Sequence, residues 1–153
     1  MNPYLLGFGA VGTTSILGSL ASSSSRSNWY DCIRPKFAPP SWLFGPVWTL
    51  LYIMIAISFS IAIKEQDMYS IYLFIFNLVL NALWSYVYFT KKKPSLALLV
   101  ILPLNISTLL IITRAKNSIV KKLLIPYFAW VTFATILNIQ TIEKEKQCKN
   151  ISD

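Results

Sequence analysis

Five long stretches without a charged residue limit the folds open to this 153-residue chain more than any other feature. They cover 1–25, 37–63, 68–90, 94–113 and 123–142. A helix rises about 1.5 Å per residue and the hydrocarbon core of a bilayer is roughly 30 Å thick, so about twenty apolar residues are enough to cross it. A soluble core helix of this length would instead carry charges along one face. The sequence therefore predicts an all-α integral membrane protein, a bundle of five transmembrane helices.

The composition agrees with this fold class. Only 13% of the residues are charged and 55% are hydrophobic, whereas soluble domains carry about 25% charge. The five stretches leave only short connections, so we expect a single five-helix transmembrane domain over 1–153. The expected helices cover about 3–25, 40–63, 68–90, 94–113 and 119–142, and a short polar tail follows at 143–153.

The basic residues predict how the bundle is oriented. In a five-helix chain the first loop, the third loop and the C-terminal tail share one side, and here they carry nine Lys and Arg against five on the other side. Because cytoplasmic loops are enriched in basic residues, we expect the C-terminus in the cytoplasm. No Lys or Arg precedes the first stretch, so we expect a retained helix there and not a signal peptide. The charges flank the spans in small groups, which argues against nucleic acid as a partner.

Single residues mark helix starts and limit the chemistry. Asp67 is placed to cap the helix that follows it, and Pro94 suits the first turn of the next helix. Cys32 and Cys148 have neither metal-site spacing nor the density of a disulfide framework, so we expect two free thiols. The chain has no histidine, which excludes a His-ligated haem, a His-based zinc site and a Ser-His triad. We expect no metal and no bound cofactor.

The span at 68–90 carries one polar and aromatic face. Asn77, Asn81, Trp84, Ser85 and Tyr88 recur at helical spacing and therefore share a side. Amide side chains are costly against lipid, so this face should point into the bundle. Hydrogen bonding between helices would be a sufficient explanation for any one of these residues.

Two more spans carry a similar face. These residues are Trp48, Thr49 and Tyr52 on the second span, and Tyr127, Trp130, Ala134 and Asn138 on the fifth. Three such faces together favour a pocket, and aromatic walls with a few amides suit a large, flat, mostly apolar ligand. The absence of charge within the spans argues against an ion channel and against acid–base catalysis inside the membrane.

Small residues follow one line along the first span. Ala10, Thr14, Gly18 and Ser22 recur every four residues, with Gly7 nearby. Such a line lets another helix approach closely. We interpret it as a packing face or a dimer contact and assign it no chemistry.

Several segments resemble the tryptophan-rich sensory protein/translocator protein family, also called the peripheral benzodiazepine receptor family. They are WYD at 29–31, PPSWLFGPVWTLLY at 39–52, LNALWS at 80–85 and LIPYFAW at 124–130. The resemblance extends over nearly the whole chain, in order, and the motif of the second span is long and specific.

The resemblance implies a membrane receptor or translocator that is commonly a homodimer. Its ligands would be porphyrins such as protoporphyrin IX, sterols such as cholesterol, and synthetic isoquinoline carboxamides and benzodiazepines. They would bind in a pocket closed by the loop between the first two helices. The implied ligand-binding residues are Tyr30, Trp48, Tyr52, Asn81, Trp84, Ser85, Trp130 and Ala134, and the polar face of the fifth span adds Asn138.

Two alternative functions stay open. Some relatives are reported to break down protoporphyrin in light, and Trp48 and Trp130 would then be the catalytic residues of a photo-oxidative enzyme. The sequence offers these indoles but no acid–base pair and no metal ligands, so binding alone is favoured. A sterol transporter ranks lower, because Ile139 stands where the family's weak sterol motif has a tyrosine. A bacterial plasma membrane and a eukaryotic organelle membrane, such as the mitochondrial outer membrane, both fit.

Overall fold

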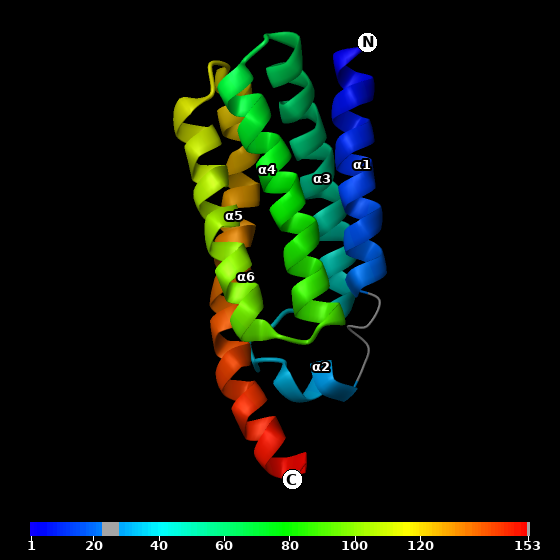
Figure 1. Ribbon diagram of the computed structural model, residues 1–153, viewed down its shortest axis with the longest axis vertical. Helices are drawn as coiled ribbons and strands as arrows, with labels where there is room; N and C mark the ends of the chain where they lie inside the picture. The colour runs from blue at the N-terminus through cyan, green and yellow to red at the C-terminus, as the bar shows by residue number, and fades with distance from the viewer. Residues whose placement is uncertain (23–27, 153) are drawn as a thin grey trace.

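The computed structural model describes residues 1–22 and 28–152, which form an up-and-down bundle of helices (Figure 1). The long helices are α1 (Pro3–Ser22), α3 (Ser41–Lys64), α4 (Met68–Ser85), α5 (Pro94–Arg114) and α6 (Ser118–Ser152). A π-helical turn, η2 (Tyr86–Thr90), continues α4, and a short helix, α2 (Asn28–Ile33), lies across one end of the bundle. Five of the described helical segments are long and apolar enough to cross a membrane. The predicted fold class, an all-α bundle with five membrane spans, is confirmed.

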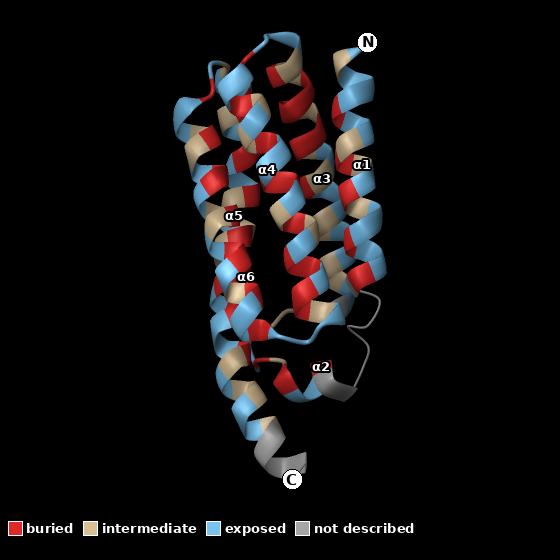
Figure 2. Ribbon diagram, in the orientation of Figure 1, coloured by how far each residue is buried: buried red, intermediate tan, exposed pale blue. Residues whose placement is uncertain are grey.

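The surface of the bundle is apolar, as a lipid-facing surface must be. Leu20 on α1 and Leu99 on α5 are 68% and 67% exposed, and many other large hydrophobic residues are open on the outside. The buried residues lie where the helices face one another (Figure 2). In water such an exterior would promote aggregation, whereas in a bilayer it contacts the acyl chains. The chain is therefore an integral, multi-pass membrane protein.

The helix starts follow from local chemistry. The Asp67 carboxylate accepts hydrogen bonds from the backbone N–H of Ser70 at 3.3 Å and from its hydroxyl at 2.7 Å, so the predicted cap is confirmed. Pro94 occupies the first turn of α5, also as predicted. A proline is tolerated there because the first N–H groups of a helix have no partner within the helix.

The helix ends differ more from the prediction. The last expected residues of the first helix, 23–25, lie outside the described residues. The end of the span expected at 68–90 is π-helical over residues 86–90. The last helix, α6, does not stop at 142 but continues to Ser152. The segment expected as a polar tail alternates Glu and Lys from Glu143 to Lys146. These are good helix formers that also pair favourably three or four residues apart, so the helix extends past the apolar span.

The line of small residues on α1 packs against α3. Gly7, Thr14 and Gly18 are buried. A side-chain carbon on Gly7 would collide with Ser60 Oγ and lie 3.0 Å from the carbonyl oxygen of Ala56. The line therefore lets two helices of the same chain approach closely. The side chain of Ser22, the last member of the predicted line, lies outside the described part.

Candidate functional site

A cavity of about 260 Å³ lies in the half of the bundle that is nearer to α2. Seven of the nine predicted ligand-binding residues line it: Tyr30, Trp48, Tyr52, Trp84, Ser85, Trp130 and Ala134. They come from α2, α3, α4 and α6, and α1 contributes Ser15, Gly18 and Ser19. The structure thus brings together residues more than one hundred positions apart in the sequence.

One wall of the cavity is built by aromatic rings of α3 and α6. The Trp48 ring lies 5.4 Å from Tyr52 at 30° and 6.4 Å from Trp130 at 90°, measured between ring centroids. Phe44 meets Trp130 edge-on at 5.8 Å. Edge-to-face and offset pairs at these distances are the favourable arrangements for aromatic side chains. The wall is therefore a fixed corner of rings.

A second aromatic wall joins the end of α4 to α2. Trp84 stacks on Tyr88 at 5.1 Å and 27°, and Phe89 meets Tyr88 edge-on at 4.8 Å. Tyr30 of α2 lies 6.0 Å from Phe89. The cross-wise helix therefore contributes directly to the lining of the cavity.

Phe44 and Phe89 also line the cavity, although neither is among the predicted site residues. Phe89 lies beside Tyr88 on the π-helical turn η2, outside the helical spacing that picked out the polar face, and the structure places both residues on the lining of the cavity. Phe44 lies within the family-like motif at 39–52, and its place in that motif could have marked it as a candidate site residue.

The two predicted amides lie behind the walls and not on them. Asn81 accepts a hydrogen bond from the Tyr52 hydroxyl at 2.9 Å and donates one to the Tyr127 hydroxyl at 2.9 Å. Asn138 accepts from Trp84 Nε1 at 2.9 Å and donates to the carbonyl of Pro94 at 2.8 Å. Each amide therefore holds an aromatic ring of the lining in one orientation.

The hydrogen bonds continue away from the cavity into the centre of the bundle. The Tyr127 hydroxyl donates to Asn77 Oδ1 at 2.9 Å, and Asn77 Nδ2 donates to Ser107 Oγ at 2.9 Å and Thr108 Oγ1 at 2.8 Å. Unpaired polar groups are costly in an apolar interior, and here each amide has its partners. Asn77 therefore has a structural role: it connects α4 to α5 and α6 through hydrogen bonds.

One donor in the cavity wall has no partner. Among the described residues, the buried side-chain polar atoms without a hydrogen bond are Trp130 Nε1 and Ser58 Oγ. Trp130 borders the cavity, whereas Ser58 does not. A buried N–H without an acceptor is unusual in a folded protein. A ligand with an acceptor atom next to Trp130 would satisfy it.

Burial also affects the tyrosine of α2. Tyr30 is 7% exposed, and its burial raises the pKa of the phenol, an effect that the nearby Arg34 partly opposes and Asp31 reinforces. The hydroxyl therefore stays protonated at physiological pH. It presents a neutral ring and a neutral polar tip to the cavity.

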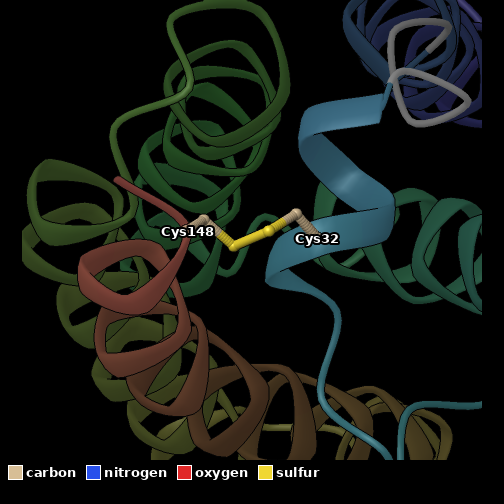
Figure 3. Close-up of a disulfide and its surroundings, with 2 residues drawn as sticks. All are labelled: Cys32 and Cys148. Carbon is tan, nitrogen blue, oxygen red and sulfur yellow. A yellow bond between two sulfur atoms is a disulfide. The ribbon is translucent and has the colours of Figure 1, made fainter. Parts of the chain in front are cut away.

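A disulfide joins α2 to the extension of α6. Cys32 is bonded to Cys148, with the Cα atoms 6.2 Å apart (Figure 3). The prediction of two free thiols is therefore wrong. The two residues are 116 positions apart, and only the unpredicted continuation of α6 carries Cys148 to the level of α2.

Known proteins share this pattern of spans and motifs. The sequence pattern of the TspO/MBR family matches residues 6–143. The Tryptophan-rich protein TspO of Archaeoglobus fulgidus is 38% identical over 134 residues, which are 84% of this chain and 88% of that protein. The Tryptophan-rich sensory protein of Cereibacter sphaeroides is 27% identical over 143 residues, covering 91% of this chain and 89% of its own. The human Translocator protein is 28% identical over 131 residues, covering 80% and 78%.

Proposed function

Because this chain belongs to the TspO/MBR family, we propose that it is a membrane receptor or translocator for porphyrins such as protoporphyrin IX and for related flat, lipophilic ligands. The ligand binds in the aromatic cavity. The observation that carries this proposal is the unpaired Trp130 Nε1 in a wall of perpendicular aromatic rings. The protein works as a homodimer, which is the state that the family resemblance implies.

The geometry of the first wall suits a planar ligand. Trp48 and Trp130 stand at 90° to each other, so a flat ring that stacks on one indole meets the edge of the other. Each such contact between aromatic rings contributes about 0.5–1.5 kcal/mol beyond the burial of area. The Trp130 N–H adds a donor for a carbonyl or carboxylate oxygen of the ligand. A sterol is less favoured, because Ile139 stands where the family's weak sterol motif has a tyrosine.

The binding test replaces single indoles in the wall. We expect Trp48→Phe and Trp130→Phe each to weaken protoporphyrin IX binding by about 1 kcal/mol, or roughly fivefold in Kd, through lost ring contact and, at Trp130, a lost donor. A titration of the purified protein, followed by the absorbance band of the porphyrin, measures this without relying on tryptophan emission. Trp42→Phe is the matched control, because Trp42 lies on the same helix, is 72% exposed and does not line the cavity.

Two outcomes contradict the proposal. The first is saturable binding that neither wall variant changes. The second is an equal loss of affinity in the Trp42→Phe control, which would indicate a general effect on the helix and not contact with the ligand.

Light-driven degradation of the porphyrin is the second candidate function. Trp48 and Trp130 both border the cavity, so two oxidisable indoles would lie next to the ligand. Illumination of the complex separates the candidates. A product spectrum that free porphyrin does not give, and that both Phe variants lose, supports an enzyme. The same spectrum as free porphyrin leaves binding alone.

A further inference from the structure

The end wall of the cavity is built differently from its sides. The sides belong to long helices that cross the membrane, whereas α2 has six residues and lies across the end of the bundle. Among its described side chains, Tyr30 is 7% exposed and Ile33 is fully buried, so both pack against the rest of the protein. Of the described elements that line the cavity, α2 is therefore the one that can move without disturbing a membrane span.

The disulfide attaches this wall to α6. Cys32 lies on the exposed side of α2, and Cys148 is half-buried on the part of α6 that extends beyond the predicted span. The bond thus adds a covalent connection between α2 and α6 to the packing of Tyr30 and Ile33. The bond joins α2 to the C-terminal part of α6 (Figure 3), and Cys32 is exposed, so a water-soluble reductant can reach it.

The size of the cavity gives this attachment a consequence. Its volume of about 260 Å³ is slightly below the range of roughly 300–1,000 Å³ that is usual for ligand pockets. A macrocycle of porphyrin size therefore needs a wall to move before it can be fully enclosed. While Cys32 and Cys148 are bonded, the most movable wall is tied to α6.

We propose that the Cys32–Cys148 pair is a redox-modification site that controls access to the cavity, with a dithiol as its co-reactant. Closed as a disulfide, the pair holds α2 against α6 and slows exchange of the ligand. Opened to two thiols, it releases α2. The role in ligand exchange depends on the proposed function, whereas the release of α2 does not.

The chemistry is ordinary thiol–disulfide exchange. A thiolate of the dithiol attacks the sulfur of Cys32, which forms a mixed disulfide and releases Cys148 as a thiolate. The second thiol of the reductant then displaces Cys32 and closes a cyclic disulfide. Two electrons and two protons pass from the dithiol to the two cysteines.

The location of the pair favours a reversible bond. The connection between η2 and α5 and the C-terminal part of α6 lie at the same end of the bundle as α2 (Figure 1). In the sequence, loop one, loop three and the C-terminal segment together hold nine of the fourteen Lys and Arg residues. The basic residues predict that this end faces the cytoplasm. Disulfides in that compartment are usually transient and redox-sensing, in contrast to the permanent ones of secreted proteins.

The first experiment compares the oxidised full-length protein with the same protein after treatment with dithiothreitol. Hydrogen exchange of the amides at 30–34 is measured without ligand, since the N–H of Arg34 donates to the carbonyl of Tyr30 at 3.0 Å at the end of α2. Stopped-flow mixing with protoporphyrin IX gives the association and dissociation rates. We expect reduction to accelerate the exchange and to raise both rates by roughly an order of magnitude, as expected for a released lid.

Serine variants provide the matched controls. Cys32→Ser, Cys148→Ser and the double variant should all behave like the reduced protein, and dithiothreitol should not change them further. Unchanged exchange at 30–34 and unchanged rates after complete reduction overturn the proposal. If reduction releases α2 but protoporphyrin IX does not bind in either state, the proposed function is wrong, while control of α2 by the Cys32–Cys148 pair is supported. If the porphyrin binds but neither the hydrogen exchange nor the binding rates respond to reduction, control of α2 by the Cys32–Cys148 pair is wrong, while the proposed function is supported.

A second experiment tests reversibility in cells. A large maleimide reagent added before lysis marks reduced cysteines by a shift in electrophoretic mobility. We expect both forms to be present, with diamide shifting the balance towards the disulfide and dithiothreitol towards the thiols. A pair that stays fully oxidised in untreated cells, with diamide and with dithiothreitol would overturn the proposal and identify a permanent structural disulfide.

Discussion

At the scale of single residues, several buried polar groups have specific partners, while Trp130 Nε1 and Ser58 Oγ have none among the described residues. Asp67 is the charged example, and it lies at the end of the bundle opposite α2 (Figure 1). Besides capping α4, its carboxylate accepts the backbone N–H of Lys116 at 3.1 Å. Beside it, the amide of Asn117 donates to Glu65 at 2.6 Å. One carboxylate thus joins the turn before α4 to the turn before α6.

This arrangement predicts a pH-dependent contribution to stability. Burial alone would raise the pKa of Asp67, but hydrogen bonds from Lys116 and Ser70 outweigh it and lower the pKa below its usual value. The charged form is therefore favoured in the folded state. Its contribution is complete above about pH 4, the ordinary pKa of an aspartate, and is lost as the pH falls through the lower folded value.

We expect Asp67→Ala to lose about 1 kcal/mol of stability at pH 7, as usual for a lost helix cap, and to lose progressively less as the medium becomes strongly acidic. Thermal unfolding in detergent at several pH values measures this difference. Glu65→Ala is the control, because Glu65 is exposed and should have a smaller effect. A loss for Asp67→Ala that does not depend on pH would contradict the assignment.

At the scale of elements, the close packing of α1 on α3 depends on a glycine, which has no side chain. A side-chain carbon on Gly7 would collide with the Ser60 hydroxyl and lie 3.0 Å from the backbone of α3, whereas Gly12 on the same helix has open space around it. The same element therefore offers a test site and its matched control. The two glycines differ in their neighbours, while their helix and their residue type are the same.

We expect Gly7→Ala to destabilise the bundle by about 1–3 kcal/mol, the usual cost of overpacking. Gly12→Ala should be neutral or stabilising, because alanine favours a helix by up to about 1 kcal/mol over glycine. Unfolding midpoints of both variants in the same detergent give the comparison. Equal effects of the two substitutions would show that the contact with α3 does not limit α1.

At the scale of the whole molecule, charge is sorted between the two ends of the bundle. By sequence, the first loop, the third loop and the C-terminal segment carry nine basic residues, and the second and fourth loops carry five. We expect the C-terminus to lie in the cytoplasm, because basic residues remain on that side during insertion. In bacterial cells a C-terminal fluorescent reporter should be active and a C-terminal alkaline phosphatase should be inactive. An active phosphatase at the C-terminus would show that the predicted orientation is wrong.

The sequence by itself determined the number of spans, several helix starts and the inward side of α4. Charge-free length and helical spacing are local properties, and a bilayer accepts few other arrangements of such segments. Asp67, Pro94 and the face from Asn77 to Tyr88 could therefore be predicted from their own neighbourhoods. Six of the seven predicted residues that line the cavity lie on faces that helical spacing picked out, whereas Tyr30 was implied by the family resemblance alone.

Only the tertiary structure decided what happens between distant segments. Asn81 and Asn138 lie behind the rings of Tyr52 and Trp84, because hydrogen-bond partners on other helices draw the amides away from the cavity. Phe89 lies on a π-helical turn that no local pattern indicates, and it also lines the cavity. The pairing of Cys32 with Cys148 depends on the length of α6 and on the position of α2, which packing across the whole chain sets and residue spacing does not.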